Sequence, residues 1–195
     1  VSCGSQLTKA FSFRPVNYPL ILHQKQQSFV LTQAFLSDIL ASIKQEMRNS
    51  MEYHTMTLAE AAAIAEWEYP EDYALYNEPD FSRLSPQQLT HYLSFCLQGQ
   101  LIGFVNLLEE SDAIFFGIGV HPQACSQGLG TAITREAIAI AKQRWPKKSL
   151  YLEVRTWNQR AIRCYEKAGF TMTKTFQMTT HLGPGSFYRM ALKQK

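Results

Sequence analysis

The sequence predicts a mixed α/β fold in which a central, mostly antiparallel sheet is flanked by helices. Two observations support this fold class. Between residues 91 and 120, three strand-like segments joined by tight turns are typical of an antiparallel meander. Strand and helix patterns then alternate from residue 121 to 168, and two further strand-like segments follow. With 46% hydrophobic and 18% charged residues, the 195-residue chain is large enough for one good core.

Residues 1–50 differ from the rest and are interpreted as an N-terminal extension to a main domain at residues 51–195. No acidic residue lies between Val1 and Ser37, a composition slightly similar to that of a transit peptide. The start Val1-Ser2-Cys3 is slightly similar to a lipid-attachment site but lacks the preceding apolar segment that such a signal needs. Apolar residues at helical spacing predict an amphipathic helix over about Leu31–Arg48. This helix could pack on the main domain, pair with a second copy in a homodimer, or be dispensable.

Charge and cysteine usage exclude several classes of partner. A net charge of +3 is too small to imply nucleic-acid binding, and no run of basic residues exceeds Lys147-Lys148. No apolar run has the length of a membrane span. The four cysteines contain no Cys-x-x-Cys pair, which argues against a structural zinc site and against a disulfide framework. Cys96 and Cys164 are interpreted as small core residues. A reducing compartment, the cytoplasm, fits best.

The main domain is expected to begin with a short strand at Glu52–Met56. Thr57, followed three residues later by Glu60, has the spacing of a capping box and predicts a helix from Leu58 to about Trp67. The stretch Trp67–Asn77 mixes aromatic and acidic side chains. Such a mixture is typical of a binding cleft and equally of a surface loop anchored by its aromatic residues.

Ser85-Pro86 predicts a short helix or turn before the meander. The strands of the meander are expected at His91–Leu97, Leu101–Leu108 and Ala113–Val120. Gly117 and Gly119 lie in the third of these strands, where glycine suits a bulge or the close approach of a ligand to the backbone.

The alternating half begins with a helix from Gly128 to about Trp145, which Pro146 ends. Gly169 then has the position of a left-handed cap at the end of a second helix. The other elements expected here are a buried strand at Ser149–Arg155, the second helix at Asn158–Ala168, and a closing hairpin of Phe170–Phe176 and Phe187–Leu192 around the turn Leu182–Gly185.

The glycine loop that precedes the first of these helices predicts an anion site. A helix that starts from such a loop leaves backbone N–H groups unpaired, and the helix dipole adds a partial positive charge. The loop is not a Walker loop, because Thr131-Ala132 follows Gly130 where Lys-Ser/Thr is needed. It is not a dinucleotide fingerprint either, because Ile133 occupies the place of the third glycine.

A second motif, on the helix at Asn158–Ala168, makes the predicted function of the glycine loop more specific. Asn158, Ala161, Tyr165 and Ala168 are spaced by three, four and three residues, and therefore lie on one face of a helix. Over about Glu52–Lys193, the sequence resembles the GCN5-related N-acetyltransferases. The resemblance lies in the order of a glycine loop, a helix, a strand and then the motif Asn-x-x-Ala-x-x-x-Tyr-x-x-x-Gly-Phe. The loop departs from the pattern usual in that family, because Cys125 stands where Arg or Gln is common and Ser126 where Gly is frequent.

The resemblance implies a binding site for acetyl-coenzyme A as co-substrate, without a metal. The pantetheine arm would enter where the strand ending at Val120 separates from the strand at Leu150–Arg155, with main-chain N–H groups near Ile118 and Val120 stabilising an oxyanion. Asn158 would bind the pantetheine amide or order the helix start, and Tyr165 would protonate the departing thiolate. The pyrophosphate would rest on the N–H groups of Ser126, Gln127, Gly128, Leu129, Gly130 and Thr131.

The general base is expected to be Glu153. The segment Leu152–Asn158 resembles the corresponding segment of bacterial ribosomal-protein N-terminal alanine acetyltransferases, in which the strand glutamate is the proposed base. The alternative is that Glu153 forms an ion pair with Arg155 or with another neighbour. Glu68, Asp72 and His121 are lesser candidates for the base, and His54, His91 and His181 have no companion residues in the sequence pattern.

The resemblance therefore implies transfer of an acetyl group to a primary amine by direct attack in a ternary complex. The acceptor could be a protein N-terminus, a lysine, a polyamine or an antibiotic, with Trp67–Glu78 as a candidate wall of its site. The alternative from another class is a non-catalytic acetyl-coenzyme A sensor, although a sensor needs no acid such as Tyr165.

Overall fold

The computed structural model describes residues 35–39, 42, 50–77, 81, 84–180 and 182–192. Contacts divide the chain after residue 46. In the first part, residues 35–39 and 42 are helical and fall within the helix expected at Leu31–Arg48. The rest of that helix, and the residues on which the transit-peptide and lipid-attachment interpretations depend, lie outside the described residues.

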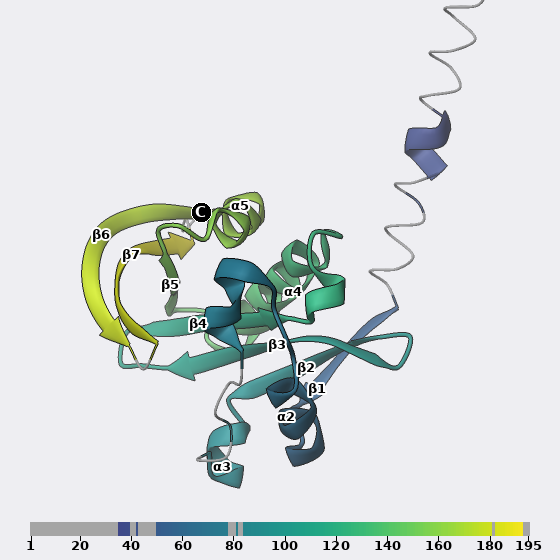
Figure 1. Ribbon diagram of the computed structural model, residues 1–195, viewed down its shortest axis with the longest axis horizontal. Coiled ribbons are helices and arrows are strands. Elements are labelled where there is room, and N and C mark those ends of the chain that lie inside the picture. The colour runs from purple at the N-terminus through teal and green to yellow at the C-terminus, as the bar shows by residue number, and fades with distance from the viewer. Residues whose placement is uncertain are drawn as a thin grey trace, which may run out of the picture. The chain divides into compact units, whose positions relative to one another are not determined.

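The described residues after residue 46 form one seven-stranded sheet with the strand order β1-β2-β3-β4-β5-β7-β6 (Figure 1). Neighbouring strands are antiparallel except for β4 and β5, which run parallel. This arrangement confirms the mixed, mostly antiparallel sheet. The strands are β1 (Met51–Thr55), β2 (Tyr92–Leu97), β3 (Gln100–Glu109), β4 (Ala113–Val120), β5 (Ser149–Arg155), β6 (Phe170–Thr180) and β7 (Gly183–Leu192).

The helices begin and end where local chemistry predicts. Thr57 and Glu60 form a complete capping box at the start of α2, and Ser85 and Gln88 form another at α3. Gly169 ends α5 with a φ of 106°. The helical elements are α2 (Leu58–Ala65), η1 (Glu71–Tyr76), α3 (Pro86–Leu89), η2 (Pro122–Ala124), α4 (Leu129–Arg144) and α5 (Gln159–Ala168).

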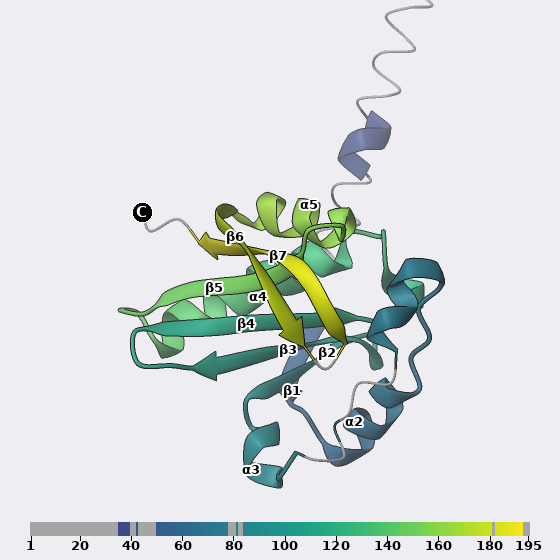
Figure 2. The same ribbon diagram turned by 60° about the vertical axis from the view of Figure 1, so that its left-hand side comes forward.

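Apolar side chains form a core on each face of the sheet. Side chains alternate between faces along a strand, so Leu93 and Val105 lie on one face and Tyr92 and Phe104 on the other. The first pair belongs to the larger core under α4 and α5, which lie side by side in both views (Figures 1 and 2). The second pair packs against the buried residues of a smaller core that includes Ile64 of α2 and Leu89 of α3.

The parallel strands β4 and β5 pair only at their beginnings. The ladder between them has three residue pairs and ends with Phe115 opposite Tyr151. Beyond this point β4 stays paired with β3, and β5 stays paired with β7. The sheet therefore opens into a gap between residues 116–120 and residues 152–155, as expected from the sequence.

The closing hairpin differs from the sequence prediction in length. Strand β6 continues to Thr180, and Gly183–Gly185, expected in the turn, belong to β7. The buried guanidinium of Arg155 explains the extension, because it reaches the hairpin end from β5. It donates hydrogen bonds of 3.2–3.3 Å to the hydroxyl of Thr180 and to the carbonyls of Leu182, Gly183 and Pro184.

Gly185→Ala is expected to destabilise the fold by about 1–3 kcal/mol through overpacking. A Cβ at residue 185 would lie 2.2 Å from Arg155 Nη1, so the guanidinium would have to leave its carbonyl partners. Urea unfolding measures the loss. The same substitution in an Arg155→Met background should add much less to the loss. Equal losses in both backgrounds would show that Arg155 does not cause the effect.

Candidate functional site

The last residues of β4 turn main-chain donors toward the gap. The N–H of His121 donates to the carbonyl of Ile102 on β3, at 2.9 Å. N–H directions alternate along a strand, so the N–H groups of Ile118 and Val120 point away from β3 and toward the gap. These are the two residues that the sequence predicted as main-chain donors.

The two glycines of β4 have different surroundings. A Cβ at Gly119 would lie 2.2 Å from the ring of Phe104, so this glycine makes room for a side chain of the smaller core. A Cβ at Gly117 would make only ordinary contacts, the nearest at 3.6 Å to Asn106. The packing of Phe104 therefore explains why residue 119 is glycine without any need for a ligand. At Gly117 no side chain of the protein fills the place of a Cβ, so a ligand could approach the backbone there.

The loop from β4 to α4 exposes backbone donors. Ser126 and Gly128 have φ values of 64° and 84°, which turn the chain sharply into the helix. Gly128 occupies the N-cap position and no side chain caps the helix there. Intrahelical bonding begins with the N–H of Ala132 and the carbonyl of Gly128, so the preceding N–H groups of the first turn have no partner within the helix. The loop therefore leaves backbone N–H groups at the start of α4 where the sequence predicted an anion site.

Helix α5 brings the second motif to the same place. Asn158 is its N-cap: the side-chain oxygen accepts from the N–H of Ala161 at 3.1 Å, and the amide donates to the hydroxyl of Tyr76 at 3.3 Å. A Cβ at Gly130 would lie 3.4 Å from Cys164 Sγ and 3.5 Å from Val120. The end of β4, the first turn of α4 and the middle of α5 are therefore in contact.

Tyr165 lies in the larger core beside the gap. Its ring meets Phe116 edge-on at 6.2 Å between centroids, and Phe116 is the first β4 residue beyond the last pair with β5. Phe170 also packs edge-on against this ring, at 6.2 Å between centroids. Burial raises the pKa of the Tyr165 phenol above its usual value, with Cys164 and Tyr76 adding to the shift. The hydroxyl therefore keeps its proton over the whole neutral pH range.

The aromatic stretch 67–77 contacts both the end of β4 and the start of α5. The Tyr69 hydroxyl donates to the carbonyl of Val120 at 2.9 Å, at the end of β4. Tyr73 packs edge-on against Trp157 at 5.5 Å and lies 3.9 Å below the guanidinium of Arg160, both near the start of α5. Sequence reasoning singled out this stretch but not these partners, because nothing local in the sequence indicates which side chains it meets.

Glu153 lies on the opposite face of β5 from Tyr165. Its neighbours Leu152 and Val154 are buried in the same core as Tyr165, and alternation turns Glu153 the other way. Glu153 pairs across the strands with Arg189 of β7, whose guanidinium donates to Oε1 at 2.5 Å and 3.1 Å. The sequence allowed for an ion pair with a neighbour, and this neighbour is Arg189 rather than Arg155.

The lesser candidates for the general base lie in positions less suited to that role than the position of Glu153. His121 caps the short helix η2, because its Nδ1 accepts from the N–H of Gln123 at 3.2 Å, and its ring lies edge-on against Trp67. Glu68 and Asp72 are exposed. None of the three forms an ion pair within the described part of the chain. Among these four groups, only Glu153 is a half-buried carboxylate on a strand that borders the gap.

Comparison with known proteins identifies relatives. The [Ribosomal protein bS18]-alanine N-acetyltransferase of Escherichia coli strain K12 is 35% identical over 95 residues, which are 46% of this chain and 64% of that enzyme. The chain thus matches less than two thirds of the length of the curated relatives found.

Solved structures share the fold. The crystal structure of the ribosomal-protein-S18-alanine N-acetyltransferase from Escherichia coli has a TM-score of 0.55 at 23% identity and covers 73% of this chain and 92% of its own. The aminoglycoside acetyltransferase AAC(6')-Ib with coenzyme A gives 0.56 at 23%, covering 73% and 95%. A spermidine N-acetyltransferase SpeG chimera from Vibrio cholerae and hSSAT gives 0.60 at 19%, covering 73% and 95%.

The sequence profile of the Acetyltransferase (GNAT) family matches residues 58–170, which are more than half of the chain. The match includes α2, the aromatic stretch, the strands that border the gap, the glycine loop and helix α5. The chain belongs to the acetyltransferase (GNAT) family.

Proposed function

We propose that the protein transfers an acetyl group from acetyl-coenzyme A to a primary amine by direct attack in a ternary complex. The observation that carries this proposal is the contact between the end of β4, the first turn of α4 and helix α5 at the open gap in the sheet. This contact supports a site in which main-chain donors of β4, the N–H groups at the start of α4 and Tyr165, whose ring meets Phe116 of β4, act together. No metal takes part in this reaction.

The backbone supplies the binding groups for the cofactor. The N–H groups of Ser126 to Thr131, with the dipole of the 16-residue helix α4, would hold the pyrophosphate. The pantetheine arm would lie in the gap between β4 and β5. The N–H groups of Ile118 and Val120 would face the thioester and stabilise the charge that develops on its oxygen. Asn158, which orders the start of α5, would offer its amide to the pantetheine.

Tyr165 would protonate the departing thiolate. Because burial raises the pKa of its phenol, the proton stays on the hydroxyl until a strong base forms beside it. The coenzyme A thiolate has a reference pKa of about 8.5 as a simple thiol, so proton transfer is favourable only where the site destabilises the thiolate. The apolar rings of Phe116 and Phe170 disfavour the phenolate as well, so the transfer requires a thiolate that is desolvated more strongly than the Tyr165 phenolate would be.

Glu153 would accept the proton of the attacking amine from the other face of the sheet. Both bonds from Arg189 go to Oε1, and within the described residues Oε2 has no hydrogen-bond partner. Oε2 is therefore the atom that can accept a proton, directly or through a water molecule. The position of Glu153 opposite Tyr165 separates the base from the acid, so the amine that attacks the carbonyl and the thiolate that leaves the tetrahedral intermediate would each have a proton-transfer group on their own side.

Glu153→Gln is expected to reduce kcat/KM by about 100-fold and to flatten the acidic limb of its pH profile, because the amide cannot accept the proton. Arg189→Gln is the matched control: it breaks the same ion pair and leaves the carboxylate. If Glu153 only holds Arg189, the two variants will lose activity equally and keep the wild-type pH profile.

The acceptor is proposed to bind against the 67–77 stretch. Its exposed carboxylates Glu68, Glu71 and Asp72 attract cationic amines, and its aromatic rings supply contact area. A peptide with a free N-terminal alanine, a polyamine and an aminoglycoside are the acceptors to try, because the relatives named above act on a ribosomal protein alanine, spermidine and aminoglycosides.

Titration with acetyl-coenzyme A, followed by a thiol-release assay against this amine panel, tests the function. Binding with release of thiol by at least one amine supports the enzyme. Binding without turnover by any amine would favour a non-catalytic sensor of acetyl-coenzyme A. No detectable binding of the cofactor would contradict both.

The compartment is proposed to be reducing, as in the cytoplasm. Cys96, Cys125 and Cys164 are all free thiols. Among the described residues, no helix combines the length and the apolar character needed to cross a membrane.

A further inference from the structure

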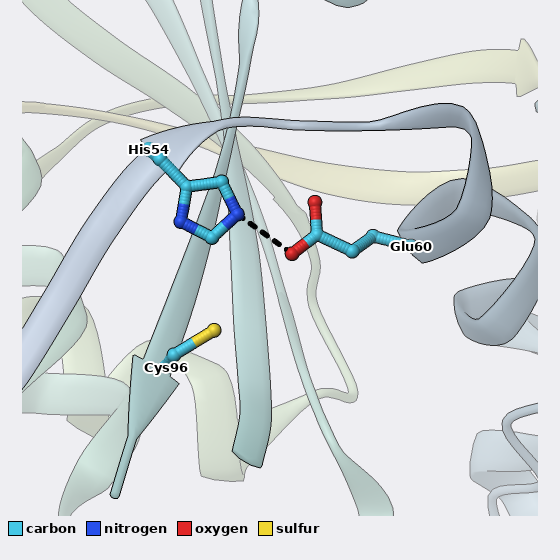
Figure 3. Close-up of side chains that lie close together, drawn as sticks. All are labelled: His54, Glu60 and Cys96. Carbon is cyan, nitrogen blue, oxygen red and sulfur yellow. Dashed lines mark hydrogen bonds and ion pairs between the residues drawn. The ribbon is translucent and has the colours of Figure 1, made fainter. Parts of the chain in front are cut away.

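A cluster of three different donor side chains lies on β1, β2 and α2, at the edge of the sheet opposite β6. The cluster consists of His54, Glu60 and Cys96, whose donor atoms all lie within 4.8 Å of one another. Figure 3 shows the Cys96 sulfur directed toward the imidazole of His54 and the carboxylate of Glu60. The proposed acetyl transfer uses none of these three residues.

Strand register brings the histidine and the cysteine to one face. His54 is paired with Ser94, and Glu52 with Cys96, in the antiparallel β1–β2 ladder. His54 and Cys96 are therefore diagonal neighbours on the same face, at a separation that medium-sized side chains can bridge. Cys96 is half-buried rather than a core residue, so its sulfur is accessible from the cluster.

The capping box fixes the carboxylate of Glu60. Its Oε2 accepts from the backbone N–H and the hydroxyl of Thr57, at 2.8 Å and 2.9 Å. Its Oε1 is the atom that faces His54 Nε2, at 2.7 Å. One oxygen is thus held by the helix start and the other is presented to the cluster, an arrangement typical of a carboxylate ligand with a supporting outer shell.

The cluster carries negative charge and an unsatisfied hydroxyl. Glu60 belongs to the cluster and Glu52 is paired with Cys96 across the ladder, and within the described residues no Lys or Arg forms an ion pair with Glu60. The Oγ of Ser94, a fully buried residue, has no hydrogen-bond partner among the described residues. A buried hydroxyl without a protein partner is uncommon in folded proteins, and this one lies on the face of β2 that carries Cys96.

We propose that His54 Nε2, Glu60 Oε1 and Cys96 Sγ bind a divalent transition metal, with zinc as the best match to a nitrogen, oxygen and sulfur donor set. In tetrahedral zinc sites, donor atoms lie about 3.3–3.8 Å apart, given metal–ligand distances of about 2.0–2.3 Å. The metal would take the place of the proton between His54 and Glu60, whose 2.7 Å separation would widen. The fourth position would hold water, within reach of Ser94.

The sequence argued against a structural zinc site because it contains no Cys-x-x-Cys pair. That argument does not apply to this cluster, because its ligands come from a strand, a helix and a second strand that only the fold brings together. A metal here would tie the edge strand β1 to the start of α2, the helix that leads into the 67–77 stretch.

Titration of the full-length, metal-free protein with Co²⁺ and with Zn²⁺ tests this proposal. Co²⁺ should produce the visible bands of a tetrahedral complex and a thiolate-to-cobalt charge-transfer band. One equivalent of Zn²⁺ per protein should then displace the Co²⁺ and abolish these bands. Cys96→Ser, His54→Gln and Glu60→Gln should each weaken Zn²⁺ binding at least about tenfold. Glu60→Gln keeps the helix cap, because Gln88 fills the same capping role at α3.

His91→Gln and Cys125→Ser are matched controls that remove a histidine and a cysteine outside the cluster, and both should bind Zn²⁺ as the wild type does. Absence of Zn²⁺ binding by the wild type would overturn the proposal. Equal binding by all five variants would overturn it too, as would a Co²⁺ spectrum without the thiolate band. Circular dichroism of each variant shows that a lost site is not an unfolded chain.

Discussion

Tyr165→Phe is expected to lower kcat about 100-fold while the Kd for acetyl-coenzyme A changes less than twofold. A positioned general acid contributes a factor of this order, and loss of the hydroxyl removes the proton donor without removing the ring. The ring should keep its place, because it packs edge-on against Phe116 and Phe170. Initial-rate kinetics, together with calorimetric titration of the cofactor, separate the two quantities.

Tyr53→Phe is the matched control for this change. Tyr53 is an exposed residue of β1 and lies outside the proposed site. Its loss of a hydroxyl should leave kcat unchanged. An unchanged kcat in Tyr165→Phe would remove Tyr165 from the role of acid, and a large loss of cofactor affinity would instead assign it to binding.

Gly128→Asp is expected to weaken acetyl-coenzyme A binding about 10- to 100-fold relative to Gly128→Asn. The two side chains have nearly the same size, both tolerate the left-handed backbone at φ 84°, and a Cβ at this residue meets no atom within 4 Å. They differ in charge. A carboxylate at the start of α4 would repel the pyrophosphate that the N–H groups of the loop are proposed to bind.

Stability should respond in the opposite direction to affinity. A negative charge at a helix N-terminus is favourable by about 0.3–1 kcal/mol, so Gly128→Asp should unfold no more easily than Gly128→Asn. The affinity difference should also shrink as salt is added, because the group is exposed. Equal affinities of the two variants would show that the pyrophosphate does not bind at this loop.

Elements with strong local signals could be predicted from the sequence closely. The capping box of Thr57 and Glu60, the stop at Pro146 and the glycine at Gly169 placed α2, α4 and α5 to within two residues. The hairpin was predicted too short because its extension depends on Arg155, a residue of another strand. Likewise, nothing local indicates that β7 rather than β6 pairs with β5.

For the candidate site too, continuous motifs could be predicted from the sequence, and contacts between distant residues could not. The loop from Ser126 to Thr131 and the stripe containing Asn158 and Tyr165 are continuous motifs, so the sequence alone could identify them. The partners of these residues come from other parts of the chain: Tyr76 for Asn158, Tyr69 for Val120 and Arg189 for Glu153. The same holds for His54, whose companions lie 6 residues away on a helix and on a neighbouring strand.

The short ladder between β4 and β5 links stability to occupancy. The sheet is in effect two smaller sheets, β1–β4 and β5–β7–β6, joined by three residue pairs. A ligand in the gap would bridge them and bind only the folded chain. By mass action it would raise the free energy of unfolding by about 2.7 kcal/mol at a concentration 100 times its Kd. Resistance to unfolding in a cell would then follow the local supply of the ligand, and depletion would leave the chain more open to proteolysis.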